Sequence, residues 1–227
     1  MSDKGTKKMA ETPSQKDVFL NTEGDHWFCR NRLVQDHESS IPYDVECMLD
    51  FCSSPEILPI NRILEIGCSD GYKLSLLASK LRSEGYGVDP STKAIEHGMV
   101  AHSESNIKLM VGTADELPFD DNYFDVVFVG FCLYLVDRDL LQATILSIDR
   151  VLRNGGVLAI TDFDVNEPII KKYHHVDGMY TYKCDYSEMF ARQLGYHLAL
   201  KASYSHKSRF YTIEPDERIA ISIMYKL

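Results

Sequence analysis

Apolar and polar residues alternate with two different periods along the chain, and the changes of period predict where strands and helices lie. Short apolar runs predict buried strands, whereas apolar residues at three- and four-residue spacing, such as Leu74, Leu77, Ala78 and Leu81, predict a helix. The first five predicted strands span residues 62–66, 86–88, 107–111, 123–129 and 157–161. The helices predicted between them span residues 72–81, 91–101 and 138–152, and Asn154–Gly155–Gly156 predicts a turn after the last of these.

Strict alternation of strand and helix indicates parallel strand pairing, with helices covering both faces of a doubly wound α/β sheet. The C-terminal part of the chain has a different pattern. Residues 187–194 predict a helix that ends at Gly195. Residues 197–204 and 218–225 alternate with period two and are joined by one loop, which predicts two antiparallel strands and brings the total to seven.

The N-terminal region has neither pattern at first. Residues 1–16 are polar and lack the apolar stretch of a signal peptide, so we expect a disordered tail. Two helices are predicted after it, over residues 22–38 and 42–53. Because no linker divides the rest of the chain, residues 17–227 are expected to form a single domain.

Charge and cysteine content exclude several classes of function. The formal net charge of −10 argues against a protein that grips nucleic acid through its phosphates, or one that binds an anionic membrane surface. No apolar run is long enough to span a bilayer. The cysteines lack the two-residue spacing of zinc or redox motifs, which indicates reduced thiols in a cytoplasmic protein. The six are Cys29, Cys47, Cys52, Cys68, Cys132 and Cys184.

The loop after the first predicted strand carries the most informative residues, because ligands of such folds bind at the carboxyl ends of the strands. It contains Glu65, Gly67, Ser69 and Gly71. A dinucleotide fingerprint requires a further glycine inside the next helix, and the residues after Gly71 do not provide it. Gly67–Gly71 also matches the G-x-S-x-G pattern of a hydrolase elbow, with Ser69 as nucleophile. In that fold, however, several strands precede the nucleophile.

Residues 63–71 resemble the first motif of class I S-adenosylmethionine (SAM)-dependent methyltransferases, with Ser69 in place of the middle glycine. Three further segments resemble later motifs in the same order, at residues 85–91, 112–119 and 152–158. Together they cover about residues 61–163, and the subgroup most similar is the one called type 11, which contains ubiquinone and small-molecule methyltransferases. The resemblance implies a mostly parallel, seven-stranded Rossmann-like sheet with an antiparallel last strand. It also implies an N-terminal helical cap over residues 17–58, a SAM-binding core over 59–163 and an acceptor-side segment with the C-terminal strands over 164–227.

The resemblance also implies roles for individual residues. Asp89 would hold the ribose hydroxyls, Asp115 would accept the adenine amino group, and Glu65 would anchor the methionine end. Trp27 and Arg30, on a predicted N-terminal helix, would close over the cofactor, and Arg30 would pair with its carboxylate. The complete set of expected SAM-binding residues is Glu65, Gly67, Cys68, Ser69, Gly71, Asp89, Pro90, Thr113, Ala114, Asp115, Glu116, Phe131, Tyr134, Trp27 and Arg30.

The general base is less clearly indicated. His174 and His175 follow the fifth predicted strand, where acceptor sites of the family commonly form, and His26 lies on the N-terminal helix. All three are candidates, although a loop histidine has many other uses. Asp162 and Asp164 could hold a divalent cation together with a histidine, but solvated aspartates at a strand end are the favoured interpretation, so no metal is expected.

The leading hypothesis is therefore a cytoplasmic enzyme that transfers a methyl group from SAM to a small molecule, most simply to an oxygen. A sugar or secondary metabolite is one candidate acceptor. The alternative is a methyltransferase-like subunit that binds SAM and regulates a partner without turnover. The expected assembly is a monomer or homodimer that binds neither nucleic acid nor a membrane.

Overall fold

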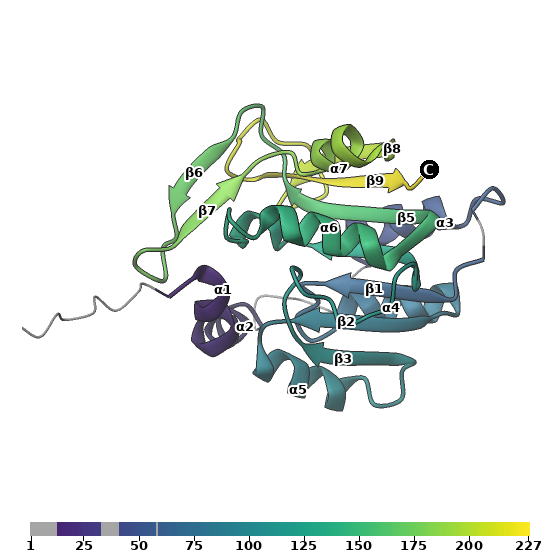
Figure 1. Ribbon diagram of the computed structural model, residues 1–227, viewed down its shortest axis with the longest axis horizontal. Coiled ribbons are helices and arrows are strands. Elements are labelled where there is room, and N and C mark those ends of the chain that lie inside the picture. Colours follow the sequence, from purple (N-terminus) through teal and green to yellow (C-terminus); the bar gives the residue numbers. More distant parts are fainter. Residues whose placement is uncertain (1–12, 33–40, 58) are drawn as a thin grey trace, which may run out of the picture.

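A computed structural model describes residues 13–32, 41–57 and 59–227 of the chain. Seven strands form one sheet in the order β3-β2-β1-β4-β5-β9-β8, and helices cover both of its faces (Figure 1). The strands of this sheet are β1 (Arg62–Ile66), β2 (Glu84–Asp89), β3 (Ile107–Val111), β4 (Phe124–Gly130), β5 (Leu152–Phe163), β8 (His197–Ser205) and β9 (Arg218–Tyr225). The helices are α1 (Gln15–Val18), η1 (Phe19–Glu23), α2 (Gly24–Asn31), α3 (Tyr43–Cys52), α4 (Tyr72–Leu81), α5 (Thr92–Ala101), η2 (Leu133–Leu135), α6 (Leu141–Val151) and α7 (Ser187–Leu194).

Strand pairing confirms the predicted fold class. Strands β1 to β5 pair only in parallel with one another, whereas β9 is antiparallel to both of its neighbours, β5 and β8. The carboxyl ends of the parallel strands therefore meet at one edge of the sheet. Helices α1 and α2 lie beyond that edge, and so does a small hairpin of β6 (Ile169–Lys172) and β7 (Tyr180–Lys183) (Figure 1).

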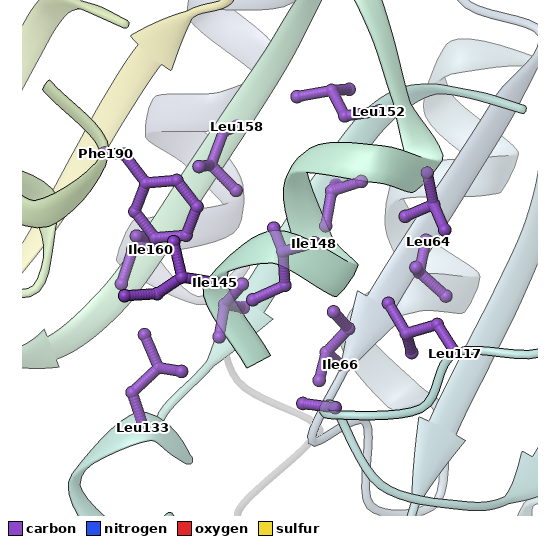
Figure 2. Close-up of a cluster of buried hydrophobic side chains, with 14 of the residues drawn as sticks. Leu64, Ile66, Leu117, Leu133, Ile145, Ile148, Leu152, Leu158, Ile160 and Phe190 are labelled. Carbon is purple, nitrogen blue, oxygen red and sulfur yellow. The ribbon is translucent and has the colours of Figure 1, made fainter. Parts of the chain in front are cut away.

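The core explains why these elements stay in place. Helix α6 packs Ile145 and Ile148 against the sheet, where they meet Leu64, Ile66 and Leu158 (Figure 2). All of these side chains are almost completely buried. Each such side chain contributes roughly 1.5–3 kcal/mol on burial, so this face of the sheet is held firmly beneath the loops after its strands. A second apolar cluster, on the opposite face, includes side chains of α3 and α4.

Several predicted boundaries differ from the structure. Gln15 and Lys16, assigned to a disordered tail, begin helix α1, while the rest of that tail up to residue 12 lies outside the described residues. Ser14 caps this helix by accepting a hydrogen bond from the backbone N–H of Asp17, which explains why it can start there. The helix predicted over residues 22–38 is observed as the end of η1 and α2, and residues 33–38 again lie outside the described part.

Two features of the C-terminal half also differ. The turn predicted at Asn154–Gly156 lies inside β5, which begins at Leu152 and shifts its register against β4. Gly155 has a φ of +70° and its N–H donates to the carbonyl of Lys226, so the glycines form an irregular strand rather than a free turn. The β6–β7 hairpin was not predicted, because its residues are mostly exposed and lack an apolar alternation.

Candidate functional site

A cavity of about 900 Å³ opens at the carboxyl ends of β1, β2 and β4. The loop after β1 forms its floor, and three residues there, Gly67, Ser69 and Gly71, have left-handed backbone conformations. Gly67 has a φ of +73°, and a Cβ on it would lie 2.8 Å from the carbonyl oxygen of Gly130. Ser69 has a φ of +50°, a conformation that costs a non-glycine residue about 1–2 kcal/mol. Ser69 thus adopts the left-handed conformation that the expected glycine would adopt, so the loop has the same backbone course.

Asp89 lies at the end of β2 and orders this loop. Its Oδ2 accepts a hydrogen bond of 2.9 Å from the Ser69 N–H, and its Oδ1 accepts one of 2.8 Å from the Ser91 N–H. Burial raises the pKa of Asp89 to about 6, although these two hydrogen bonds favour the charged form. At neutral pH the side chain is therefore a carboxylate, with two oxygens at the cavity wall.

Glu65, on β1, is 2% exposed and lies near an ion pair whose carboxylate is buried and whose lysine is about one third exposed. Lys73 Nζ of α4 is 2.5 Å from Asp44 Oδ2 of α3, and the Asp44 carboxylate also accepts a hydrogen bond from Thr161. Burial raises the pKa of Glu65 to about 8, and the positive charge of Lys73 opposes that rise only in part. The carboxyl groups of Glu65 and Asp44 thus lie near a single lysine, Lys73. This Glu65 cluster can therefore accept one further positively charged group when Glu65 is ionised.

The opposite end of the cavity contains Asp115, whose carboxylate is already engaged. Lys16 Nζ of α1 lies 2.6 Å from Asp115 Oδ2. Burial alone would raise the pKa of Asp115, but hydrogen bonds from Lys16 and Thr113 hold it below its usual range. Lys16 is kept there by Asp137, which accepts hydrogen bonds from the backbone N–H groups of Gln15 and Lys16 at 3.1 and 2.8 Å. No local signal in the sequence indicated that Lys16 would pair with Asp115.

Aromatic side chains line the cavity beyond β4. Phe131 has a φ of +53° and follows the last residue of β4, and its ring lies 4.9 Å from that of Tyr134 between centroids. Its N–H donates to the carbonyl of Thr161, which holds the unusual backbone in place. Tyr204 and His206, from β8 and the loop after it, also line this part of the cavity. Neither residue was predicted from the sequence to belong to this site.

Most of the predicted cofactor residues do line the cavity. The structure brings together Trp27, Glu65, Gly67, Cys68, Ser69, Asp89, Pro90, Thr113, Ala114, Asp115, Phe131 and Tyr134. Gly71, Glu116 and Arg30 are not among the lining residues. Gly71 precedes α4 with a φ of +79° and packs against Leu109, so its role is to shape the loop. Arg30 bonds the buried carboxylate of Glu23 and the hydroxyl of Tyr173, which points its charge away from the cavity.

The three histidines predicted as bases also lie elsewhere. His26 is exposed on α2, where its side chain is 66% accessible and 3.9 Å from Glu23. His174 and His175 are exposed in the turn between β6 and β7. None of the three lines the cavity: His26 lies on α2 with its side chain exposed, and His174 and His175 are exposed between the two strands of the hairpin.

Asp162 and Asp164 are both engaged by the protein itself. Asp162 is buried and accepts hydrogen bonds from the N–H groups of Tyr134 and Phe163, and burial raises its pKa to about 7. Asp164 pairs with Lys201 at 2.8 Å and with Arg218 at 3.3 Å. Within residues 13–32, 41–57 and 59–227, no group of three or more metal-ligating side chains is found. No helix of the described chain is long and apolar enough to cross a membrane.

The polar atoms of the cavity fit SAM. Glu65 Oε2 and Ser69 Oγ are buried and have no hydrogen-bond partner among the described residues. An unsatisfied buried polar atom costs about 1–3 kcal/mol, which a bound partner removes. The ammonium group of SAM would suit the Glu65 cluster, and its ribose diol would suit the Asp89 carboxylate. Aromatic rings such as Phe131 suit a sulfonium cation.

Comparison with known proteins agrees with this assignment. Residues 64–160 match the family model described as a methyltransferase domain. A fatty-acid O-methyltransferase of Mycolicibacterium smegmatis is 33% identical over 103 residues, covering 45% of this chain and 37% of the relative. A ubiquinone/menaquinone biosynthesis C-methyltransferase of Vibrio parahaemolyticus is 32% identical over 124 residues, or 51% and 47% of the two proteins. The chain thus spans about half or less of the length of these curated relatives.

Solved structures show the same fold. The 1,6-didemethyltoxoflavin-N1-methyltransferase of Burkholderia thailandensis, crystallised with S-adenosylhomocysteine, has a TM-score of 0.73 at 13% identity. That match covers 96% of this chain and 93% of the other. A SAM-dependent methyltransferase of Methanosarcina mazei has a TM-score of 0.60 at 21% identity, with 76% and 95% coverage. Residues 64–160 thus match the methyltransferase-domain family, and the sheet that contains them has the fold of these solved structures.

Proposed function

We propose that the protein binds SAM in this cavity and transfers its methyl group to a small molecule, at an oxygen atom. The observation that carries the proposal is the pair of unpartnered buried oxygens, Glu65 Oε2 and Ser69 Oγ, at the cavity floor. Glu65 lies near the end of β1, and Ser69 lies on the following loop, whose shape Asp89 maintains. The relative named a fatty-acid O-methyltransferase supports oxygen as the acceptor atom.

In this proposal SAM supplies a methyl group on a positively charged sulfur, and the protein supplies binding and alignment. Glu65 would hold the ammonium group, with the Asp44 carboxylate of the Asp44–Lys73 pair nearby, and Asp89 would hold the ribose. Phe131, fixed by its hydrogen bond to Thr161, would help to exclude water from the site. Alignment of this kind can contribute roughly 7–11 kcal/mol to a transfer reaction.

The N-terminal segment would act as the cover of the site. Asp25 of α2 accepts hydrogen bonds from Ser91 Oγ and from the Lys93 N–H, both at the start of α5. Gln15 of α1 accepts a hydrogen bond from the Tyr180 N–H on the β6–β7 hairpin. We propose that the chain forms one domain from about residue 15 onward. Its N-terminal cap extends to residue 58, its SAM-binding core to residue 163, and the acceptor-side segment follows. The proposal also includes a cytoplasmic monomer or homodimer without a nucleic-acid partner, in keeping with the net charge of −10.

Transfer of a labelled methyl group tests the proposed function directly. Purified protein is incubated with methyl-tritiated SAM and a panel of phenols, aliphatic amines and long-chain fatty acids, and extracted products are counted. We expect label in at least one class of acceptor and none without protein. Calorimetric binding of S-adenosylhomocysteine without transfer would favour the regulatory subunit, and absence of binding would refute both.

Binding of S-adenosylhomocysteine is also expected to release protons. Burial keeps Glu65 largely protonated below its pKa of about 8, and a bound ammonium group favours the carboxylate. At pH 7 roughly one proton per site should therefore be released, and affinity should rise with pH up to about 8. Calorimetry in buffers of different ionisation enthalpy measures this release. Glu65→Gln should abolish it, whereas a release that the variant retains would contradict the assignment.

A further inference from the structure

His206 is the histidine that lines the cavity in the described part of the chain. It is the first residue after β8, on the loop that leads to β9. Its ring stacks on that of Phe131 at 5.0 Å between centroids and 24° between planes. Its backbone N–H donates a hydrogen bond of 2.7 Å to the carbonyl of Glu217, which ties the start of this loop to its end. The imidazole is thus held in a defined place against the ring that closes the end of β4.

The surroundings of His206 keep its imidazole neutral at neutral pH. Partial burial lowers its pKa below the usual 6.5, and the positive charges of Lys73 on α4, Lys183 on β7 and Lys207 on its own loop lower it further. Glu217 opposes them, but its carboxylate is paired with Lys207. A neutral imidazole has one nitrogen with a free lone pair, as proton removal requires.

The ring nitrogens of His206 are also free to meet a ligand. Among the described residues no side chain or backbone group makes a hydrogen bond to the imidazole, although it stacks on Phe131. The cavity beside it is lined by Tyr43, Thr161 and Tyr204. These side chains offer flat apolar surface with a few hydroxyl groups, which suits an acceptor with a flat body and one reactive hydroxyl or amine.

We propose that His206 is the general base of the reaction, and that the acceptor carries a hydroxyl or amine proton which His206 removes. This inference rests on the proposed function, and it includes, beside the oxygen acceptor named there, an amine nitrogen that carries a transferable proton. The acceptor oxygen or nitrogen forms its bond to the methyl carbon while the carbon–sulfur bond breaks, and that electron pair stays on sulfur. The acceptor proton passes to the free imidazole nitrogen and then to solvent. A carboxylate acceptor would have no proton to give and would make no use of this residue.

The test compares His206→Gln with His197→Gln, its matched control at the exposed start of β8, the strand that ends just before His206. Removal of a general base lowers turnover by about 10²–10⁴-fold. We expect that loss for His206→Gln with phenol or amine acceptors, together with loss of the acid limb of the pH–rate profile. Binding of S-adenosylhomocysteine by calorimetry should change by less than about twofold, since a base for the acceptor contributes little to cofactor affinity. His197→Gln should behave as the wild type.

A second measurement does not depend on turnover. Histidine titration by nuclear magnetic resonance, with the His206 signal assigned by its absence in the variant, should give a pKa for His206 below the ordinary value of 6.5. A His206 pKa at or above 6.5 would overturn the inference. Transfer to fatty acids alone, or equal turnover by His206→Gln, would overturn it while leaving the proposed function intact. A wild type without any transfer would overturn both.

Discussion

Replacement of Asp89 by alanine is expected to weaken binding of S-adenosylhomocysteine by at least about 100-fold. Each hydrogen bond to a charged group contributes roughly 1.5–3 kcal/mol, and the two ribose hydroxyls would donate to this carboxylate. The same side chain bonds the N–H groups of Ser69 and Ser91, so its loss also loosens the loop that approaches the cofactor. Calorimetric titration at pH 7.5, above the raised pKa of about 6, measures the affinity with Asp89 ionised.

Two further variants separate these effects. Asp89→Asn keeps one acceptor oxygen, and we expect an affinity between those of wild type and Asp89→Ala. Asp120→Ala removes a carboxylate outside the cavity, so it alters net charge equally and should leave affinity unchanged. Thermal unfolding of each variant without ligand shows whether the fold is intact. A folded Asp89→Ala protein with wild-type affinity would refute the ribose assignment.

Replacement of Lys73 by methionine is expected to lower the free energy of unfolding by about 3 kcal/mol, because removing one partner of a buried ion pair leaves the other charge uncompensated. Asp44 is 2% exposed and Glu65 also 2%, so both carboxyl groups would stay in place without their cation. Lys73 itself is about one third exposed, at 34%, which favours the lower end of the usual range. Urea unfolding at pH 7.5 measures the change.

The control for this prediction restores the charge balance. Asp44→Asn combined with Lys73→Met removes both charges of the pair, and we expect it to recover most of the lost stability. Lys80→Met, at the exposed end of the same helix, should change stability by no more than about 1 kcal/mol. If Lys73→Met lowers the free energy of unfolding no more than Lys80→Met does, the Asp44–Lys73 pair does not stabilise the floor of the cavity.

Local patterns predicted much of the fold correctly. The bounds of β1, α4, β3 and α7 agree with the sequence prediction to the residue, and Ser91 caps α5 by accepting a hydrogen bond from the Ala94 N–H. These features depend on neighbours a few positions apart, so the sequence contains their cause. The β6–β7 hairpin has no such local signal, since its strands are stabilised by one another and by contacts such as Lys183 with Asp216.

The candidate site, too, has features that local sequence patterns predicted and features that they did not. The order of Glu65, Ser69, Asp89 and Asp115 along the chain was enough to predict the loop ends that form the cavity, because parallel strands bring their carboxyl ends to one edge. The direction of charged side chains was not predictable. Arg30 turns to Glu23 because that carboxylate is buried beside it, and so it does not face the cavity as expected.

The sequence by itself therefore determined the fold class, the resemblance to methyltransferases and the loop at the floor of the cavity, since each depends on local periodicity or on a motif read in order. Only the tertiary structure decided which charges share a site. Lys16 meets Asp115 from 99 positions away, and His206, after the edge strand β8, meets Phe131 at the end of the central strand β4. Burial and electrostatic neighbours are properties of non-local contacts, and these set the pKa of each group in the cavity.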